Sequence, residues 1–283
     1  MLIDAHLHLS FVDNKSIFLK DALKKIYPTF VSVDKKTSNY LLNLTKEHQI
    51  PVFIGFHPLF LDKAIDDNKI KENLSFLKQQ LESYKESVRD SDNLPYSLCG
   101  LGEIGLDKSA LSPLFLQIKL LEGELILAHN YKKAVSIHCV KAHNELLALL
   151  HTLYKQGIKP KINLHGANLS LNLYEQYKKF DVYLSFGRNL LKEIKKPKDS
   201  NSVDDLILKV DDRHFFINEK CRALLKATSL DKILIESDFD KNSDTYDEVF
   251  LKQLYILASR IKNITFDAFL EQVLKNYKDY INY

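Results

Sequence analysis

Eight short apolar runs alternate with longer amphipathic segments, and this alternation limits the possible folds more than any other feature of the chain. The runs lie at residues 2–9, 30–34, 52–58, 97–107, 134–139, 161–167, 182–187 and 233–240. Segments with apolar residues near i, i+3, i+4 and i+7, which predict helices, include 37–49, 70–84, 114–130, 142–157 and 170–180. Strands that alternate with helices form parallel sheets. Eight such repeats favour a (β/α)8 barrel of the α/β class, and we expect one domain over residues 1–283.

Composition describes an ordinary globular protein and excludes several classes of function. Hydrophobic residues make up 45% and charged residues 27% of the chain, and the net charge of +3 creates no global field for a nucleic acid, although a local site stays open. The apolar segment LFLQIKLLEGELILAH contains charges, so no membrane span is expected. Three cysteines cannot form a complete disulfide set, and no signal peptide is visible. These features predict a cytoplasmic protein without a membrane partner and leave its oligomeric state open.

Histidines and acids gather at the carboxyl ends of the predicted strands. In the first run, His6 and His8 are two residues apart and share one strand face with Asp4. The later runs end in His57, in Glu103 with Asp107, in His138, in His165, and in Glu236 with Asp238. Any one of them has an ordinary alternative, such as a hydrogen-bonded core histidine or, for Asp107, a helix cap. A closed barrel brings all strand ends to one mouth, so the whole set predicts a bound cation.

The ligand types limit the identity and number of the ions. Imidazole and carboxylate without thiolate suit zinc, manganese, iron or a magnesium-like ion. Six ligands are too many for one tetrahedral site with an open position, but they suffice for two divalent ions that share a bridging carboxylate. We expect one ion on His6, His8 and Asp238, the other on His138 and His165, and Glu103 on both. Cys139 follows a ligand and should face the opposite side of its strand, as part of the core.

The motifs at these strand ends resemble those of a known family. IDAHLHLS resembles the D-x-H-x-H-L opening of the TatD family of metal-dependent deoxyribonucleases, within the amidohydrolase-like barrels. GFHP matches its G-x-H-P, and GEIGLD matches its G-E-x-G-L-D. SIHC, NLHG and IESD stand where the family has its later histidines and its E-T-D segment. The resemblance extends to the C-terminal KNYKDYI, where Asn276 resembles a late family asparagine.

The resemblance implies a barrel, a dinuclear metal centre and hydrolysis of phosphodiester bonds in DNA, with the same six ligands by position. We expect single-stranded DNA to be cut exonucleolytically by water that the metals activate. His57 resembles the family's substrate-contacting histidine. Asp238 and Glu103 are the expected catalytic carboxylates, with Asp238 as the acceptor of the water's proton. Glu236 is expected to orient a ligand histidine.

The loops around these motifs depart from the family, and the departures put the substrate in question. Val140, followed by Lys141, stands where the family has an arginine, and a lysine replaces a bidentate clamp only as a point charge. GANLS follows His165 in place of C-F-S/T-G, and ESDFDKN lacks the family's proline. Two other interpretations therefore stay open. One is a dinuclear hydrolase of amide or ester bonds. Glu103 argues against it, because it stands where many hydrolases of the wider superfamily have a modified lysine that bridges their metals. The other is a barrel that retains metal but only binds a partner, against which the complete ligand set argues.

Two polar stretches, at residues 85–95 and 191–214, look like excursions from the barrel. Both are expected to be solvated surface. The lysines of LLKEIKKPK at 190–198 have the charge to guide a nucleic-acid strand toward the mouth, but a solvated face is the favoured interpretation.

Overall fold

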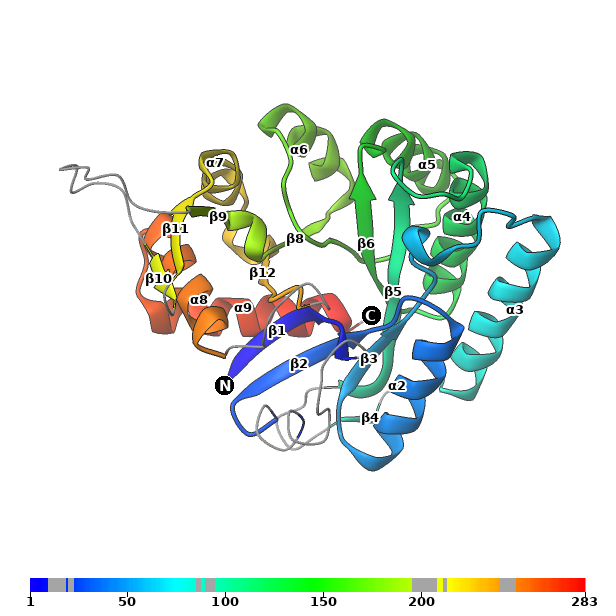
Figure 1. The fold of residues 1–283 in the computed structure, drawn as a ribbon, viewed down its shortest axis with the longest axis horizontal. Coiled ribbons are helices and arrows are strands. Elements are labelled where there is room, and N and C mark those ends of the chain that lie inside the picture. The colour runs from blue at the N-terminus through cyan, green and yellow to red at the C-terminus, as the bar shows by residue number, and fades with distance from the viewer. Residues whose placement is uncertain are drawn as a thin grey trace.

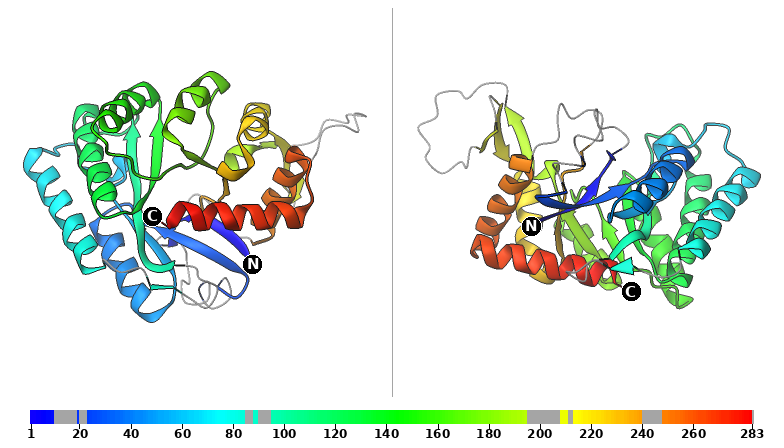
Figure 2. Two further views of the ribbon diagram at one scale, coloured as in Figure 1. Left: turned by 180° about the vertical axis from the view of Figure 1, so that it is seen from behind. Right: turned by 90° about the horizontal axis from the view of Figure 1, so that it is seen from below.

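A barrel of eight parallel strands forms the centre of the molecule, as the sequence predicts (Figures 1 and 2). The computed structural model describes residues 1–9, 19, 23–84, 88–89, 95–194, 208–210, 213–239 and 248–282. In spatial order the strands are β1 (Leu2–Leu7), β2 (Ile26–Val31), β3 (Pro51–Ile54), β5 (Pro95–Asp107), β6 (Ala134–Val140), β7 (Ile162–Leu164), β8 (Tyr183–Phe186) and β12 (Ile233–Ile235). A parallel bridge between Leu7 and Phe239 joins the segment after β12 to β1 and closes the ring.

Helices lie around the strands in both views of Figure 2. Their bounds are α2 (Lys35–Glu47), α3 (Asp67–Ser83), α4 (Leu114–Asn130), α5 (His143–Lys155), α6 (Leu171–Tyr177), α7 (Glu219–Ala227), α8 (Glu248–Lys262) and α9 (Phe266–Ile281). Short 3-10 helices are η2 (Pro58–Phe60), η3 (Lys178–Phe180), η4 (Arg188–Leu190) and η5 (Leu230–Lys232). The five predicted helical segments correspond to α2 through α6, with η3 extending α6. Side-chain caps fix the starts of α2, α3 and α6: in α2 the Asp34 carboxylate accepts a hydrogen bond from the Thr37 amide at 2.7 Å.

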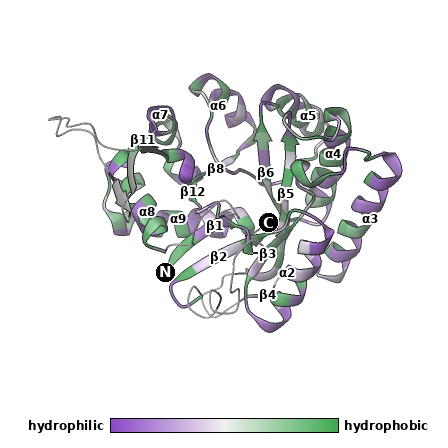
Figure 3. Ribbon diagram, in the orientation of Figure 1, coloured by the Kyte–Doolittle hydropathy of each residue, from purple (hydrophilic) through white to green (hydrophobic). Residues whose placement is uncertain are grey.

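Helix α4 is the most apolar helical segment because it is covered on two sides. Its residues Leu120, Leu121 and Leu125 are buried, and its Gly123 faces α3. A Cβ at Gly123 would lie 2.4 Å from Leu74 Cδ1, so the two helices pack in close contact there. Figure 3 shows the other outer helices with mixed hydrophilic and hydrophobic residues, as amphipathic helices require. Among the described residues, no helix has the length and apolar character that crossing a bilayer requires.

The excursion after β8 differs from the prediction of a plain solvated surface. It contributes β9 (Leu191–Ile194), β10 (Leu208–Val210) and β11 (Arg213–Ile217), which form a separate antiparallel sheet in the order β10-β11-β9. Alternating apolar and charged residues, as in LKEI, form strands when a partner strand is present. Most of the lysines singled out at 190–198 lie outside the described residues. Of the other polar stretch, β4 (Val88–Arg89) pairs with the start of β5.

Asn276 of α9 fixes the start of the last barrel strand. Its side-chain amide is buried and donates to the carbonyls of Leu230 and Ile233, at 2.7 and 2.8 Å. These carbonyls lie where η5 passes into β12. Asn276 therefore anchors the strand that leads to Glu236 and Asp238.

Candidate metal centre

The carboxylate of Glu103 lies at the centre of the predicted site, on β5. Nitrogens of five imidazole rings approach the two oxygens of this carboxylate. The five rings come from the ends of four other strands. For Oε2 the neighbours are His8 Nε2 at 3.0 Å and His6 Nε2 at 3.3 Å; for Oε1 they are His165 Nε2 at 2.6 Å, His57 Nε2 at 2.9 Å and His138 Nδ1 at 2.9 Å. The barrel thus brings together the histidines that the sequence analysis singled out.

Among the residues that the structure describes, three groups of side chains have ligand atoms within 4.8 Å of one another. They are His6, His8 and Glu103; His6, His165 and Asp238; and His57, Glu103 and His138. Together these overlapping groups contain every residue that was expected to bind metal. His6 belongs to two of them, and its ring stacks on that of His165, with centroids 4.2 Å apart.

Gly105 permits the backbone of β5 to pass close to β6 beside this cluster. Its φ of +148° lies in a region that favours glycine, and a Cβ there would lie 1.9 Å from the carbonyl oxygen of His138. The strand register pairs Gly105 with His138. The glycine of GEIGLD therefore allows Glu103 and His138 to sit side by side.

The second ring nitrogens of two histidines show which nitrogen carries a lone pair. His8 Nδ1 lies 3.0 Å from the carbonyl oxygen of Val31, which can only accept, so Nδ1 is the donor. His138 Nε2 lies 3.1 Å from Asp107 Oδ2 and donates to that carboxylate. In the neutral rings, His8 Nε2 and His138 Nδ1 then point lone pairs at the Glu103 carboxylate. Lone pairs facing a carboxylate repel it unless a cation lies between them, and this arrangement fits metal ligands.

His57 has the opposite arrangement. Its Nδ1 accepts a hydrogen bond from the amide of Leu59 at 3.1 Å, so its proton lies on Nε2. That Nε2–H is 2.9 Å from Glu103 Oε1 and donates to it. A nitrogen that carries a proton has no lone pair for a metal. His57 is thereby distinguished from His8 and His138, although distance alone groups it with potential ligands.

The charges of the cluster are strongly coupled. Burial raises the pKa of Glu103, but the surrounding histidines outweigh burial and hold it well below its usual value. Burial lowers the pKa of His165, but Glu103 outweighs this and raises it well above its usual value. His6 is neutral near pH 7 because burial and the nearby His165 lower its pKa to about 4. Without a metal, protons thus supply the positive charge that the Glu103 carboxylate requires.

Asp238 reaches the cluster from a backbone turn just after β12. Its φ is +48°, and its amide donates to the carbonyl of His6 at 3.1 Å. Next to it, the amide of Ser237 donates to Asp4 Oδ1 at 2.8 Å. The buried Asp4 thereby fastens this turn to β1. Burial and the neighbouring carboxylates raise the pKa of Asp238 to about 6, against the lowering effect of His165.

Glu236 lies behind His165 and holds the loop that follows it. Its Oε1 accepts from the amide of Gly166 at 2.6 Å, and its Oε2 accepts from the Ser185 hydroxyl. His165 Nδ1 is 3.7 Å from Glu236 Oε1, which is ion-pair distance but too long for a hydrogen bond. Glu236 was expected to orient a ligand histidine. It contacts the backbone next to His165 directly and the His165 ring at a longer distance.

Two supporting contacts were missed by sequence reasoning. Asp107 was singled out at its strand end, with a helix cap as the alternative; it does accept from the Ser109 amide at 2.7 Å, and its other oxygen holds His138. Ser136 Oγ contacts His6 Nδ1 at 2.9 Å. The signal in the sequence was the aspartate at the end of GEIGLD, which is Asp107. In the structure it lies two residues beyond Gly105, the strand partner of His138. Cys139 belongs to none of the three donor groups; it is half-buried, packs against the hydrophobic core and also lines a cavity.

Comparison with known proteins agrees with this architecture. A family model described as TatD related DNase matches residues 3–282. The structure of YjjV, a TatD homologue from Escherichia coli K12, is 20% identical with a TM-score of 0.71, covering 98% of this chain and 96% of that one. A TatD family hydrolase from Entamoeba histolytica is 16% identical with a TM-score of 0.70, covering 99% and 97%.

More distant structures share the barrel. The phosphotriesterase homology protein from Escherichia coli, solved with phosphate in its active site, is 14% identical with a TM-score of 0.59, covering 99% of this chain and 98% of that one. Comparison with curated protein sequences gives no match. The solved structures establish the fold, and the family model, which spans nearly the whole chain, establishes the family. With a barrel mouth of histidines and carboxylates suited to divalent metals, the chain belongs to the TatD-related DNase family of metal-dependent hydrolases.

Proposed function

We propose that this protein hydrolyses phosphodiester bonds of single-stranded DNA from a strand end, with two divalent ions held at the barrel mouth. The observation that carries the proposal is the direction of the ring nitrogens around Glu103. With their protons on His8 Nδ1 and His138 Nε2, the two rings in their neutral form present the lone pairs of His8 Nε2 and His138 Nδ1 to opposite oxygens of one buried carboxylate. This arrangement supports two adjacent ions that share Glu103.

The ligands divide between the two ions as their positions suggest. One ion is assigned to His6, His8 and Asp238, the other to His138 and His165, and Glu103 serves both. Divalent ions bound there would supply Lewis acidity toward a phosphoryl oxygen and make water more acidic. Zinc, manganese and magnesium all suit this mixture of imidazole and carboxylate.

The remaining residues act on the substrate and on the proton. His57 presents an Nε2–H that is free to move from Glu103 to a phosphoryl or leaving-group oxygen, where charge develops in the transition state. Asp238 is the candidate acceptor of the water's proton, because it lies at the half-buried edge of the cluster. Glu236 is a positioning residue that acts through His165 and Gly166. Three free cysteines support a reducing compartment such as the cytoplasm.

Hydrolysis by metal-loaded protein tests the proposal. Linear single-stranded DNA should be degraded, and chelation should abolish the reaction. A circular single strand of the same sequence should resist, because it offers no end. The control is Glu103→Gln, which keeps the shape of the side chain but lacks the charge to hold two ions, and it should be inactive.

Other outcomes would replace the proposal. Cleavage of the circle would show an endonuclease. Faster hydrolysis of 4-nitrophenyl acetate than of DNA, RNA or bis(4-nitrophenyl) phosphate would favour an ester or amide hydrolase. Failure on every substrate by protein that holds metal would favour a barrel that only binds a partner.

A further inference from the structure

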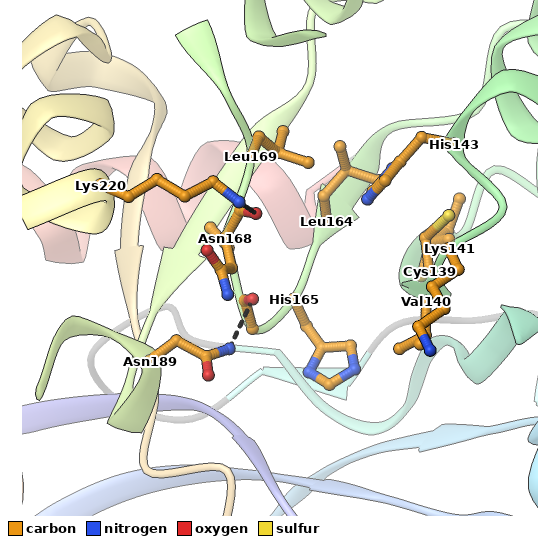
Figure 4. Close-up of a pocket in the computed structure, with 13 residues that line it drawn as sticks. Cys139, Val140, Lys141, His143, Leu164, His165, Asn168, Leu169, Asn189 and Lys220 are labelled. Atoms are coloured by element: carbon orange, nitrogen blue, oxygen red, sulfur yellow. Dashed lines mark hydrogen bonds between the residues drawn. The ribbon is translucent and has the colours of Figure 1, made fainter. Parts of the chain in front are cut away.

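A cavity of about 410 Å³ opens beside the metal centre (Figure 4). The loop after β6, the loop after β7, η4 and the start of α7 form its walls. His165 is one of its lining residues, and Nε2 of the same ring lies 2.6 Å from Glu103. A ligand in this cavity would therefore lie next to whatever group occupies the metal centre. The volume is in the range of small-molecule pockets and is too small for duplex nucleic acid.

The polar side chains of the cavity favour an anion. Its 13 lining residues include two lysines, Lys141 and Lys220, and no aspartate or glutamate. Lys141 has no ion-pair partner among the residues that the structure describes. Lys220 Nζ donates to the carbonyl of Asn168 at 2.8 Å, and an ammonium group has two more hydrogens to offer. Burial and the charge of Lys220 lower the pKa of His143 to about 4, so this lining histidine is neutral near pH 7 and leaves the lysines as the charged groups.

The remaining wall is apolar and has a fixed shape. Leu164, Ala167 and Leu169 line it and are buried against the barrel. Asn189 Nδ2 donates to the carbonyl of Gly166 at 2.8 Å and ties η4 to the loop after β7, as Figure 4 shows. A ligand that fits both walls needs one apolar, flat or compact part and one negatively charged part. A nucleotide has these two parts in its base and its phosphate.

We propose that this cavity binds a single nucleotide unit next to the scissile phosphate, with Lys141 and Lys220 contacting its phosphate and the Leu164–Leu169 wall receiving its base. The inference rests on the proposed phosphodiesterase function and extends it to the substrate's neighbouring nucleotide. A cavity for one unit suits an enzyme that removes nucleotides from an end. Lys141 and Lys220 are then specificity residues and are distinct from the metal ligands.

Binding of small probes to the metal-loaded protein tests the cavity directly. Deoxyadenosine 5′-monophosphate, deoxyadenosine, ribose 5-phosphate and inorganic phosphate would each be titrated by calorimetry. The monophosphate should bind most tightly, because it alone fills both walls. Lys141→Met and Lys220→Met remove the charge but keep the aliphatic stem, and each should weaken monophosphate binding about tenfold, as expected for a charged hydrogen bond. Lys141→Arg should retain the affinity, which shows that the loop still folds.

Lys226→Met is the matched control, because Lys226 is an exposed lysine on the same helix as Lys220 and does not line the cavity. It should bind the monophosphate like the wild type. Equal affinities in wild type, Lys141→Met and Lys220→Met would overturn the proposal. So would equal binding of deoxyadenosine and its monophosphate, which would exclude a phosphate contact. Equal binding of ribose 5-phosphate or inorganic phosphate would exclude recognition of a nucleotide.

The result is separable from that of the hydrolysis assay. Lysine-dependent binding of the monophosphate in a protein that cleaves no phosphodiester would keep the cavity and reject the proposed function. Cleavage of DNA with unchanged kcat/KM in both lysine variants would keep the function and reject the cavity. If both proposals hold, the ratio of kcat/KM for a 5′-phosphorylated dinucleotide to that for bis(4-nitrophenyl) phosphate should fall about tenfold in each lysine variant.

Discussion

Two buried glutamates, Glu103 at the barrel mouth and Glu124 in the helix layer, have pKa values shifted in opposite directions. Imidazole nitrogens surround Glu103, and its pKa is held well below the usual value despite burial. Glu124 is equally buried, but its described contact is the amide of Phe56, which donates to Oε1 at 3.3 Å. Burial without a cation raises its pKa well above the usual value. The imidazoles thus favour the charged form of Glu103, whereas burial favours the protonated form of Glu124.

The difference shows what distinguishes a site from ordinary buried polarity. A buried carboxyl without a cation discharges itself by taking up a proton, and the fold tolerates it as a neutral group. Five imidazoles around one carboxylate are expensive to desolvate and are not needed for stability. Their rings are fixed further by Val31, Ser136 and Asp107. Such ordering indicates a group that must remain charged and positioned, as a bridging metal ligand must.

The largest effect that would sharpen this contrast is expected at His57, whose Nε2 carries the proton because its Nδ1 accepts from the Leu59 amide. His57→Ala should retain metal but lose about 10²–10³ in kcat, as when one preorganised donor is removed from a transition state. Metal content and steady-state kinetics on DNA would be measured together. His151→Ala, which removes an exposed histidine of α5, is the control and should behave like the wild type. Loss of metal from His57→Ala would place His57 among the ligands.

A smaller effect is expected at Asp107, which fixes the ring of His138. Asp107→Asn has only one oxygen for two donors, His138 Nε2–H and the Ser109 amide. Metal affinity should fall about 10–100-fold, as when the hydrogen-bond partner of a ligand histidine is removed. Competition with a chelating dye would measure it. Asp62→Asn is the control, because Asp62 is an exposed aspartate that also accepts from the amide two residues further on. Its metal affinity should equal that of the wild type. An unchanged affinity in Asp107→Asn would mean that Asp107 is only a turn residue.

The smallest effect is expected at Glu124 and concerns stability. Its folded pKa is raised, so the folded state holds a proton that the unfolded chain releases above its ordinary pKa of about 4.5. The wild type should therefore lose stability as the pH rises above about 4.5. Glu124→Gln does not titrate there, so its free energy of unfolding should rise relative to that of the wild type between pH 4.5 and pH 8. Each kcal/mol of this gain should raise its relative Tm by about 2–4 °C.

Thermal melts from pH 4.5 to pH 8 would follow this gain. Glu122→Gln on the same helix is the control for replacing a carboxyl by an amide in α4. A constant difference for Glu124→Gln would mean that Glu124 is ionised in the fold, and the contrast with Glu103 would fail.

Sequence reasoning found the parts of the molecule that strand periodicity and strand ends define. The eight barrel strands follow from short apolar runs, and the place of Glu103 among the histidines follows from the geometry of a closed barrel. Contacts that depend on register between strands were not accessible. Asp107 reaches His138 across the β5–β6 pairing, and Val31 fixes His8 through a backbone carbonyl that no sequence pattern marks. The β9–β11 sheet was missed because a charged, alternating strand resembles solvated surface until its partner is known.

Elemental analysis of purified protein after incubation with manganese, zinc and magnesium tests the central claim most directly. The claim is that Glu103 bridges two divalent ions at the barrel mouth. The wild type should hold close to two ions per chain, and Glu103→Gln should lose both occupancies together. A wild type that binds no metal under any of these conditions would contradict the account, as would a Glu103→Gln variant that still holds two ions.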